Sequence, residues 1–231
     1  MELLITDITR MQKGYICIGG IDMPTRQRVR PVLADGQIPI TWTPAHGGIV
    51  DYRRVIDIGP GRFIGRAPET EDVLVTLQDL VLRRTMAVEE FLETLQSVSK
   101  LNARLSFGPT LRRHENGHDY VTPHGLGLRS LAIQSLEAGR VELLVAGRSI
   151  RAKWRDGMDL AVTDLRLFEN DGATVRKRRV ALLNELLQRE SGFVALGLTR
   201  PWRQRQSPDP VDYHWLQVNA IHVPGSLDWA L

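Results

Sequence analysis

Arginine dominates the residues that could bind a charged ligand, because the chain has 26 arginines and only four lysines. The planar guanidinium group binds phosphate through two parallel hydrogen bonds and also stacks on bases. A GC-rich genome would produce the same bias without a functional cause. The positions of the arginines therefore have to decide between the two explanations.

Two segments alternate basic and other residues with the period of an extended strand, so the basic side chains of each segment share one face. In the second segment the intervening residues are apolar, which gives the strand an opposite face to bury. Each basic face binds phosphate in one interpretation, and in the other it is a solvated surface paired with acids. The six residues are Arg26, Arg28, Arg30, Arg151, Lys153 and Arg155.

A third segment, residues 199–205, places Trp202 among several arginines at the end of an expected strand. An indole can stack on a base while neighbouring arginines such as Arg200 and Arg203 neutralise its phosphates. Trp202 closes the end of a barrel in the structural interpretation. This segment is the most suggestive short stretch for nucleic-acid binding.

Catalytic and cofactor motifs are not found in the sequence, which contains neither a GxSxG nucleophile elbow nor a Walker A loop. Cys17 stands in an apolar run that keeps its thiol neutral. Asp7 and Asp164 could form a carboxylate pair, but the pattern favours a turn cap after each strand. We therefore expect no enzymatic activity and no cofactor.

Three histidines, His114, His118 and His124, are close enough in sequence to raise the possibility of a metal site. Asn116 and Gly117 favour turns between them rather than a helix that would align the imidazoles. No cysteine lies nearby. A bound metal is not expected.

The overall composition fits a globular chain of 231 residues with a net charge of +3 and 42% hydrophobic residues. A single cysteine cannot form an intramolecular disulfide, which favours a reducing cytoplasm. The sequence contains no stretch of about 18 apolar residues, so we expect no membrane span. The charge balance alone excludes neither a nucleic acid nor a protein partner.

Short apolar runs separated by glycine and proline predict a mainly β fold in both halves of the chain. Apolar residues at helical spacing predict one helix across residues 88–98, with Thr85 as its N-cap. A second helix is expected across residues 180–187, with Asp171 or Thr174 as its cap. Each half therefore contains several strands and one helix.

This order of elements fits two small OB-like β-barrels, one in residues 1–107 and one in residues 108–231. Similarity between the halves favours a duplicated module. The matching pairs are residues 14–19 with 192–197, residues 5–8 with 162–165, and Arg30-Pro31 with Arg200-Pro201.

The runs LITDITR, GYICIGG and VRPV near the N-terminus, with GLTRPW and WLQVNAI near the C-terminus, resemble the dual OB-containing domain family. Members of this prokaryotic family are mostly uncharacterised. The resemblance implies a pair of OB-like barrels and a nucleic-acid-binding role, in genetic settings that include defence against phages. It brings no catalytic residues, and Arg30 and Arg200 are the polar positions that carry over.

The sequence thus favours a cytoplasmic nucleic-acid-binding protein, with single-stranded DNA or RNA as the preferred ligand. Its expected binding residues are the six residues of the two basic faces together with Arg200, Trp202 and Arg203. The alternative is a protein-interaction subunit of a multi-protein system, possible in phage defence, without its own nucleic-acid specificity. Its arginines would then pair with acidic side chains of a partner encoded nearby.

Overall fold

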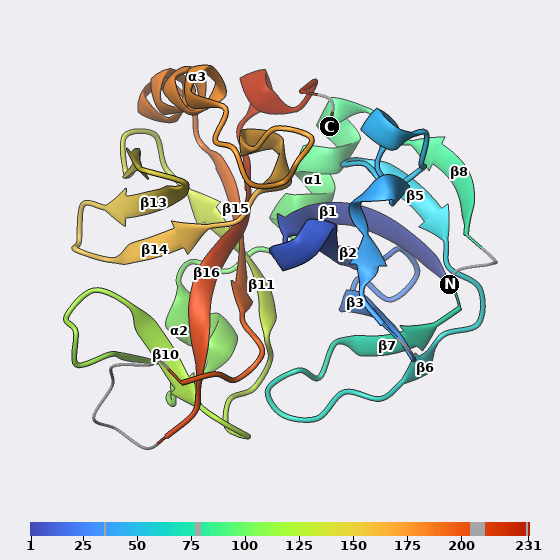
Figure 1. Cartoon of the computed structure of the whole chain (residues 1–231), viewed down its shortest axis with the longest axis horizontal. Helices are drawn as coiled ribbons and strands as arrows, with labels where there is room; N and C mark the ends of the chain where they lie inside the picture. The colour runs from blue at the N-terminus through green and yellow to red at the C-terminus, as the bar shows by residue number, and fades with distance from the viewer. Residues whose placement is uncertain (35, 77–79, 204–210, 230) are drawn as a thin grey trace.

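Short apolar runs separated by glycine and proline form a mainly β structure, as the sequence predicts. The fold is described from a computed structural model, which places residues 1–34, 36–76, 80–203, 211–229 and 231. The strands form two sheets that lie beside each other, one from each half of the chain (Figure 1).

The first sheet has the strand order β6-β7-β3-β2-β1-β5-β8, and β4 also pairs with β2. Neighbouring strands are antiparallel except for β3 and β7, whose parallel register places Arg30 opposite Asp72. The strands are β1 (Glu2–Arg10), β2 (Tyr15–Asp22), β3 (Arg28–Leu33), β4 (Ile38–Pro39), β5 (Arg54–Asp57), β6 (Arg62–Phe63), β7 (Asp72–Val75) and β8 (Val81–Thr85).

The second sheet has the order β11-β15-β16-β14-β13-β12, with β10 paired to β16 and β9 to β10. The two sheets confirm the mainly β class. No closed barrel is found in the described part of the chain, so the OB-like barrels stay a prediction. The strands are β9 (Arg112–Arg113), β10 (Tyr120–Pro123), β11 (Leu131–Leu136), β12 (Val141–Ala146), β13 (Ser149–Trp154), β14 (Asp159–Val162), β15 (Gly192–Leu198) and β16 (Tyr213–His222).

Both helices expected from apolar spacing are present, and the described residues also contain a third, short α-helix. The predicted caps are wrong, because Ala87 and Arg176 hold the N-cap positions of the two longer helices. None of the described helices has the length and apolar character needed to cross a membrane. The α-helices are α1 (Val88–Val98), α2 (Ala103–Phe107) and α3 (Lys177–Arg189), and the 3-10 helices are η1 (Gln12–Gly14), η2 (Ile40–Trp42), η3 (Pro44–His46), η5 (Leu165–Leu167) and η6 (Pro224–Ser226).

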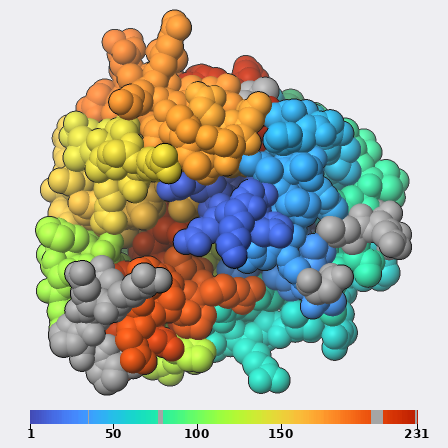
Figure 2. Space-filling model, in the orientation of Figure 1, coloured from blue at the N-terminus to red at the C-terminus, as the bar shows by residue number. Residues whose placement is uncertain are grey.

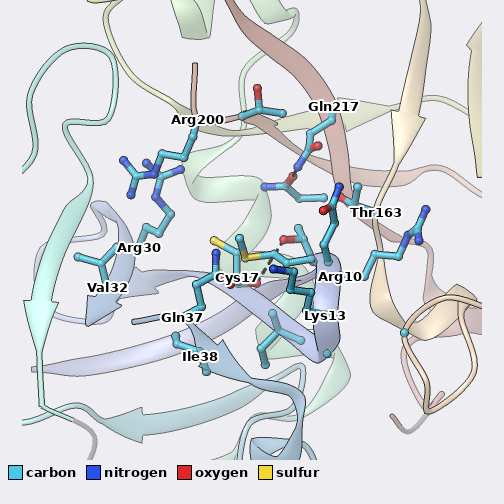
Figure 3. Close-up of a pocket in the computed structure, with 18 of the residues that line it drawn as sticks. Arg10, Lys13, Cys17, Arg30, Val32, Gln37, Ile38, Thr163, Arg200 and Gln217 are labelled. Atoms are coloured by element: carbon cyan, nitrogen blue, oxygen red, sulfur yellow. Dashed lines mark hydrogen bonds between the residues drawn. The ribbon is translucent and has the colours of Figure 1, made fainter. Parts of the chain in front are cut away.

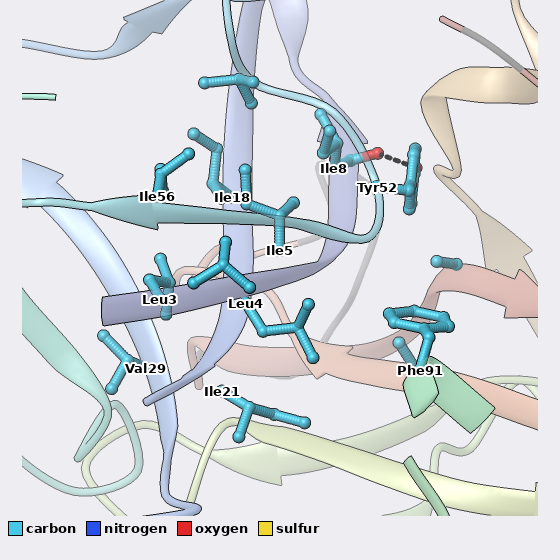
Figure 4. Packing of buried hydrophobic residues seen from close by; sticks show 14 of the residues in the cluster. Leu3, Leu4, Ile5, Ile8, Ile18, Ile21, Val29, Tyr52, Ile56 and Phe91 are labelled. Atoms are coloured by element: carbon cyan, nitrogen blue, oxygen red, sulfur yellow. Dashed lines mark hydrogen bonds between the residues drawn. The ribbon is translucent and has the colours of Figure 1, made fainter. Parts of the chain in front are cut away.

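Strand β1 is buried on both faces, since Leu3, Leu4 and Ile5 are all fully shielded from solvent (Figure 4). Phe91 of α1 packs in the same hydrophobic cluster, which continues to Ile133, Phe193 and Ala195 on the second sheet. The two sheets therefore share a core where they meet. The predicted module boundary at residues 107 and 108 lies at the end of α2, and the division into two modules stays a prediction.

One part of the predicted internal repeat is wrong. Residues 192–197 lie in β15 and residues 15–19 in β2, which follows Gly14 at the end of η1. Residues 5–8, however, lie in β1, whereas 162–165 run from the end of β14 into η5. Asp7 pairs with Gly19 beside the register shift between β1 and β2, and Asn219 is the residue left out of the register at the shift between β15 and β16. A Cβ on Gly19 would come within 2.1 Å of Asp7, and one on Gly197 within 2.4 Å of Asn219.

His222 ends β16 and is fully buried between the rings of Tyr52 and Phe91, whose centroids lie 6.0 and 5.2 Å away. Burial, aided by the Arg166 guanidinium, lowers the pKa of His222 to about 3. Neither ring nitrogen has a hydrogen-bond partner of good geometry within the described chain. The core therefore holds a neutral imidazole at pH 7.

We expect acidification below pH 6.5 to destabilise the fold, because the unfolded chain then protonates His222 while the folded chain resists protonation down to about pH 3. This group contributes a loss of up to about 1.4 kcal/mol for each pH unit in that window. Urea unfolding of His222→Leu between about pH 7 and pH 4 should show a weaker pH dependence than the wild type. Burial also lowers the pKa of His214, which continues to contribute in the variant.

At pH 7, His222→Leu should remain close to wild-type stability, because no well-formed hydrogen bond is lost. A variant that loses stability with acid as steeply as the wild type would contradict the role assigned to His222. The measurement needs no knowledge of function.

Candidate functional site

The first basic segment does not form the exposed three-arginine face that its alternation predicts. Arg28 and Arg30 are only 8% and 5% exposed, whereas Arg26 precedes β3 in an exposed turn with a positive φ of 58°. Arg28 binds Asp7, and Arg30 Nε donates to Asp72 Oδ1 at 2.5 Å. The alternation was correct for a strand, but both faces of β3 are buried, so Arg28 has no surface to offer a phosphate.

The second basic segment does have the predicted faces, since Arg151 and Lys153 point away from the buried side of β13. Arg151 is already held by Asp119 at 2.8 Å and Asp159 at 2.7 Å. Lys153 is about half-exposed, with Asp159 at 3.9 Å, and Arg155 is exposed just beyond the strand. These residues lie outside the cleft described below, so the two basic segments do not form one surface.

The Arg/Trp segment combines a structural contact with an exposed ring. Trp202 stacks on Trp215 with ring centroids 5.0 Å apart, yet 46% of Trp202 remains exposed. Arg200 binds Asp72 at 2.6 Å, and Arg203 lies 3.3 Å from Asp212. Arg205, in the same sequence stretch, lies outside the described residues.

The three histidines do not converge on a metal. His114 instead packs its ring against Trp215 at 4.8 Å and Tyr213 at 5.7 Å. His124 lies 5.7 Å from His214. Residues 114–118 have the spacing of an HExxH motif, but they form a turn between β9 and β10 rather than the helix that this motif requires. Among the described residues, no group of three or more histidine, cysteine, aspartate or glutamate side chains is arranged to hold a metal ion.

A cleft of about 940 Å³ lies between the two sheets and brings together residues far apart in the sequence. The turn between β1 and β2 and strand β3 line it from the first sheet, and the β12–β13 turn, the end of β15 and β16 line it from the second. In Figure 2 the dark blue N-terminal segment and the orange and red C-terminal segment border a recess near the centre of the visible face. Figure 3 shows the side chains that point into it.

Positive charge dominates the lining of this cleft. Asp171 is the one acidic residue among the described residues that line it, and hydrogen bonds from Thr174 and Ala173 lower the pKa of its carboxyl group to about 2. Five cationic residues face this single carboxylate, namely Arg10, Lys13, Arg30, Arg148 and Arg200.

Three of these cations have no ion-pair partner among the described residues: Arg10, Lys13 and Arg148. The Arg10 guanidinium lies over the Phe168 ring at 4.1 Å, and its Nη2 donates to the Arg148 carbonyl at 3.4 Å. Partial burial lowers the pKa of Arg10, but an arginine stays charged at neutral pH. We call these three residues the cationic rim.

Lys13 adopts the left-handed backbone conformation, with φ 60° and ψ 31°, inside the turn between β1 and β2. Most residues other than glycine avoid this region, at a cost on the order of 1 kcal/mol. The strained turn holds an exposed lysine beside the cleft. Sequence reasoning missed the rim because it searched strands for alternation, although Lys13-Gly14 and Gly147-Arg148 each pair a cation with a turn glycine.

Cys17 also lines the cleft and is a free thiol. Burial raises the pKa of the Cys17 thiol, and the charges of Arg30 and Asp7 act on it in opposite directions. The thiol is therefore neutral at pH 7 and contributes shape rather than nucleophilic chemistry.

Comparison of the chain with protein-family models, with curated proteins and with solved structures finds no match in any of the three. The resemblance to the dual OB-containing domain family stays a prediction from the sequence.

Proposed function

We propose that the protein binds single-stranded nucleic acid in the cleft between its two sheets. The observation that carries this proposal is a cleft of about 940 Å³ lined by five cationic side chains and one carboxylate, with the partly exposed Trp202 in its wall. Ligand sites in proteins commonly have volumes of about 300 to 1,000 Å³, so this cleft has room for a short stretch of strand.

The charge of the cleft suits a polyanion, because the cationic rim is not committed to carboxylates of the described chain. Phosphates that replace counterions near Arg10, Lys13 and Arg148 supply affinity that is independent of sequence. The binding residues proposed here differ from those expected from the sequence, since Arg28 and Arg151 are held in ion pairs. Arg30, Arg200 and Trp202 remain part of the proposal because all three line the cleft.

A single strand suits the cleft better than a duplex because Trp202 can stack on a base only where the base is unpaired. Trp215 supports the Trp202 ring from its other face, which holds the indole in place without covering it. OB-like folds bind single strands with this combination of stacking residues and a positive groove. Membership of that fold class is part of the proposal, as is binding without catalysis.

A protein-interaction role is the second candidate, favoured by an apolar surface on and beside α2. Leu101, Leu105 and Leu128 are 80%, 61% and 61% exposed. Exposed leucines in one region are typical of protein contacts. Replacing all three with serine should abolish a complex with the product of a neighbouring gene and leave strand binding intact, and persistence of that complex would refute this candidate.

We expect Lys13→Gln/Arg148→Gln to weaken the binding of single-stranded DNA and RNA of any sequence, because both side chains are exposed in the cationic rim. Each lost phosphate contact makes the slope of log affinity against log salt concentration shallower by about 0.7, so the slope of the double variant should be shallower by about 1.4. Fluorescence anisotropy of labelled oligonucleotides across a salt series measures both quantities. Arg104→Gln/Arg178→Gln removes the same charge from exposed sites outside the cleft and is the control.

If the rim and control variants lose affinity equally, attraction is diffuse and the cleft is not the site. If the wild type binds no strand even at low salt, the nucleic-acid proposal itself fails.

We expect Trp202→Ala to reduce affinity for a single strand by about 5- to 150-fold, since a stacked base contributes about 1 to 3 kcal/mol. Trp202→Phe should retain most of the affinity because it keeps an aromatic face. Phe63→Ala removes another exposed aromatic ring, 54% exposed and outside the cleft, and should have no effect. Quenching of tryptophan fluorescence on binding, lost in Trp202→Phe, would place the base on this ring.

A further inference from the structure

Two arginines from different sheets converge on one carboxylate at the wall of the cleft. Arg30 Nε donates to Asp72 Oδ1 at 2.5 Å, and Arg200 Nη2 donates to Asp72 Oδ2 at 2.6 Å. Glu69 adds a second contact to Arg200 Nη1 at 3.3 Å. Both guanidinium groups are thereby fixed side by side, as Figure 3 shows for Arg30 and Arg200.

The carboxylates that fix this arginine pair are not part of the cleft lining, whereas both arginines are. Asp72 and Glu69 thus hold the guanidinium groups from behind and leave other edges of the planar groups toward the cleft. A guanidinium has five N–H donors, and one bidentate or two single contacts do not use all of them. Each arginine therefore keeps N–H donors that its carboxylate contacts do not use.

Arg30 carries an unmet hydrogen-bonding requirement at this place. Its side chain is 6% exposed, and its Nη2 has no hydrogen-bond partner in the described part of the chain. A buried, unpaired N–H on a charged group is unfavourable and indicates an acceptor that completes the site. Arg200, in contrast, is 54% exposed, so the pair combines a buried donor with one open to solvent.

We propose that the arginine pair, Arg30 and Arg200, is a seat for one phosphate group, so that a bound nucleotide places its phosphate there and its base on Trp202. This inference deepens the proposed function, and it rests on that proposal only in taking the ligand to be a nucleic-acid strand. Guanidinium groups bind phosphate oxygens through parallel hydrogen bonds, and two of them can contact adjacent oxygens. Trp202 follows Arg200 by two residues and lines the same cleft.

The phosphate could be a diester within a strand or a terminal monoester, which share the same chemistry. Four probes separate these sources: thymidine, thymidine 5′-monophosphate, the dinucleotide with one internal phosphodiester, and inorganic phosphate. Phosphorus NMR titration follows the three phosphate-bearing probes directly, and calorimetry compares them with thymidine. The full-length protein is used throughout.

In the wild type, at least one phosphate-bearing nucleotide should bind more tightly than thymidine, and Arg200→Gln should reduce that advantage by about tenfold. Glu69→Gln should have the opposite effect and tighten phosphate binding several-fold, because it removes a carboxylate that competes for Arg200. If Arg200 had only a structural role, the two substitutions would not change phosphate affinity in opposite directions. Arg83→Gln is the matched control, since Arg83 is 50% exposed and bound to Asp57 away from the cleft.

If Arg200→Gln loses more affinity for the monophosphate than for the dinucleotide, the seat takes a terminal phosphate. If it loses more for the dinucleotide, the seat takes an internal one. The phosphate seat is overturned if thymidine binds as tightly as its monophosphate, or if Arg200→Gln and Arg83→Gln behave alike while both remain folded by thermal unfolding. Tight binding of long strands by the wild type, together with a phosphate advantage that is unchanged in Arg200→Gln, would leave the proposed function standing and refute the seat. Phosphate binding at the pair without any strand binding would do the reverse.

Discussion

Two buried carboxylates, Asp7 and Asp164, lie where the sheets meet, and each can stay charged there only beside a guanidinium group. Asp164 Oδ2 accepts from Arg166 Nη2 at 2.7 Å, and its Oδ1 lies 2.9 Å from the Tyr52 hydroxyl of the first sheet. Asp7 binds Arg28 in the same way. Burial favours the neutral carboxyl in both cases, but the arginines outweigh it and lower the pKa of each carboxyl group. Breaking either pair would leave an uncompensated buried charge. The same two carboxylates also connect the sheets, because Asp164 accepts from Tyr52 of the first half and Asp7 accepts from Asn219 of the second.

The cations of the chain fall into two groups: those paired with buried carboxylates where the sheets meet, and those that remain open to a ligand. Arg28 and Arg166 belong to the first group, because their buried partners leave them almost no exposed surface. Lys13 and Arg148 belong to the second group, since they lie in the β1–β2 and β12–β13 turns that line the cleft. Arg30 belongs to both, being buried in an ion pair while lining the cleft. Arginine content alone therefore says little about function in this fold, and burial decides which arginines can bind.

Local patterns predicted the elements well because the causes of those elements are local. Apolar spacing located the helices at 88–98 and 177–189 within a few residues, and alternation assigned the two faces of β13. The same alternation misjudged β3, because period-two spacing separates two faces without saying whether either one meets solvent. Asp72, which neutralises Arg30, lies 42 residues later and reaches it only through the parallel β3–β7 pair. The cleft was outside the reach of such patterns, since its cations come from strands and turns of both halves of the chain.

The contact between Asp7 and Asn219 joins two polar side chains of different sheets without adding a second charge. Gly19 and Gly197 lack the Cβ atoms that would block the side chains of Asp7 and Asn219, which lie beside and at a register shift, respectively. Asn219 Nδ2 donates to Asp7 Oδ2 at 3.2 Å. A second aspartate at this position would place two carboxylates in contact, and their repulsion would favour the protonated form of one of them. The amide supplies a donor instead, so the contact adds a hydrogen bond to Asp7 while Arg28 balances its charge.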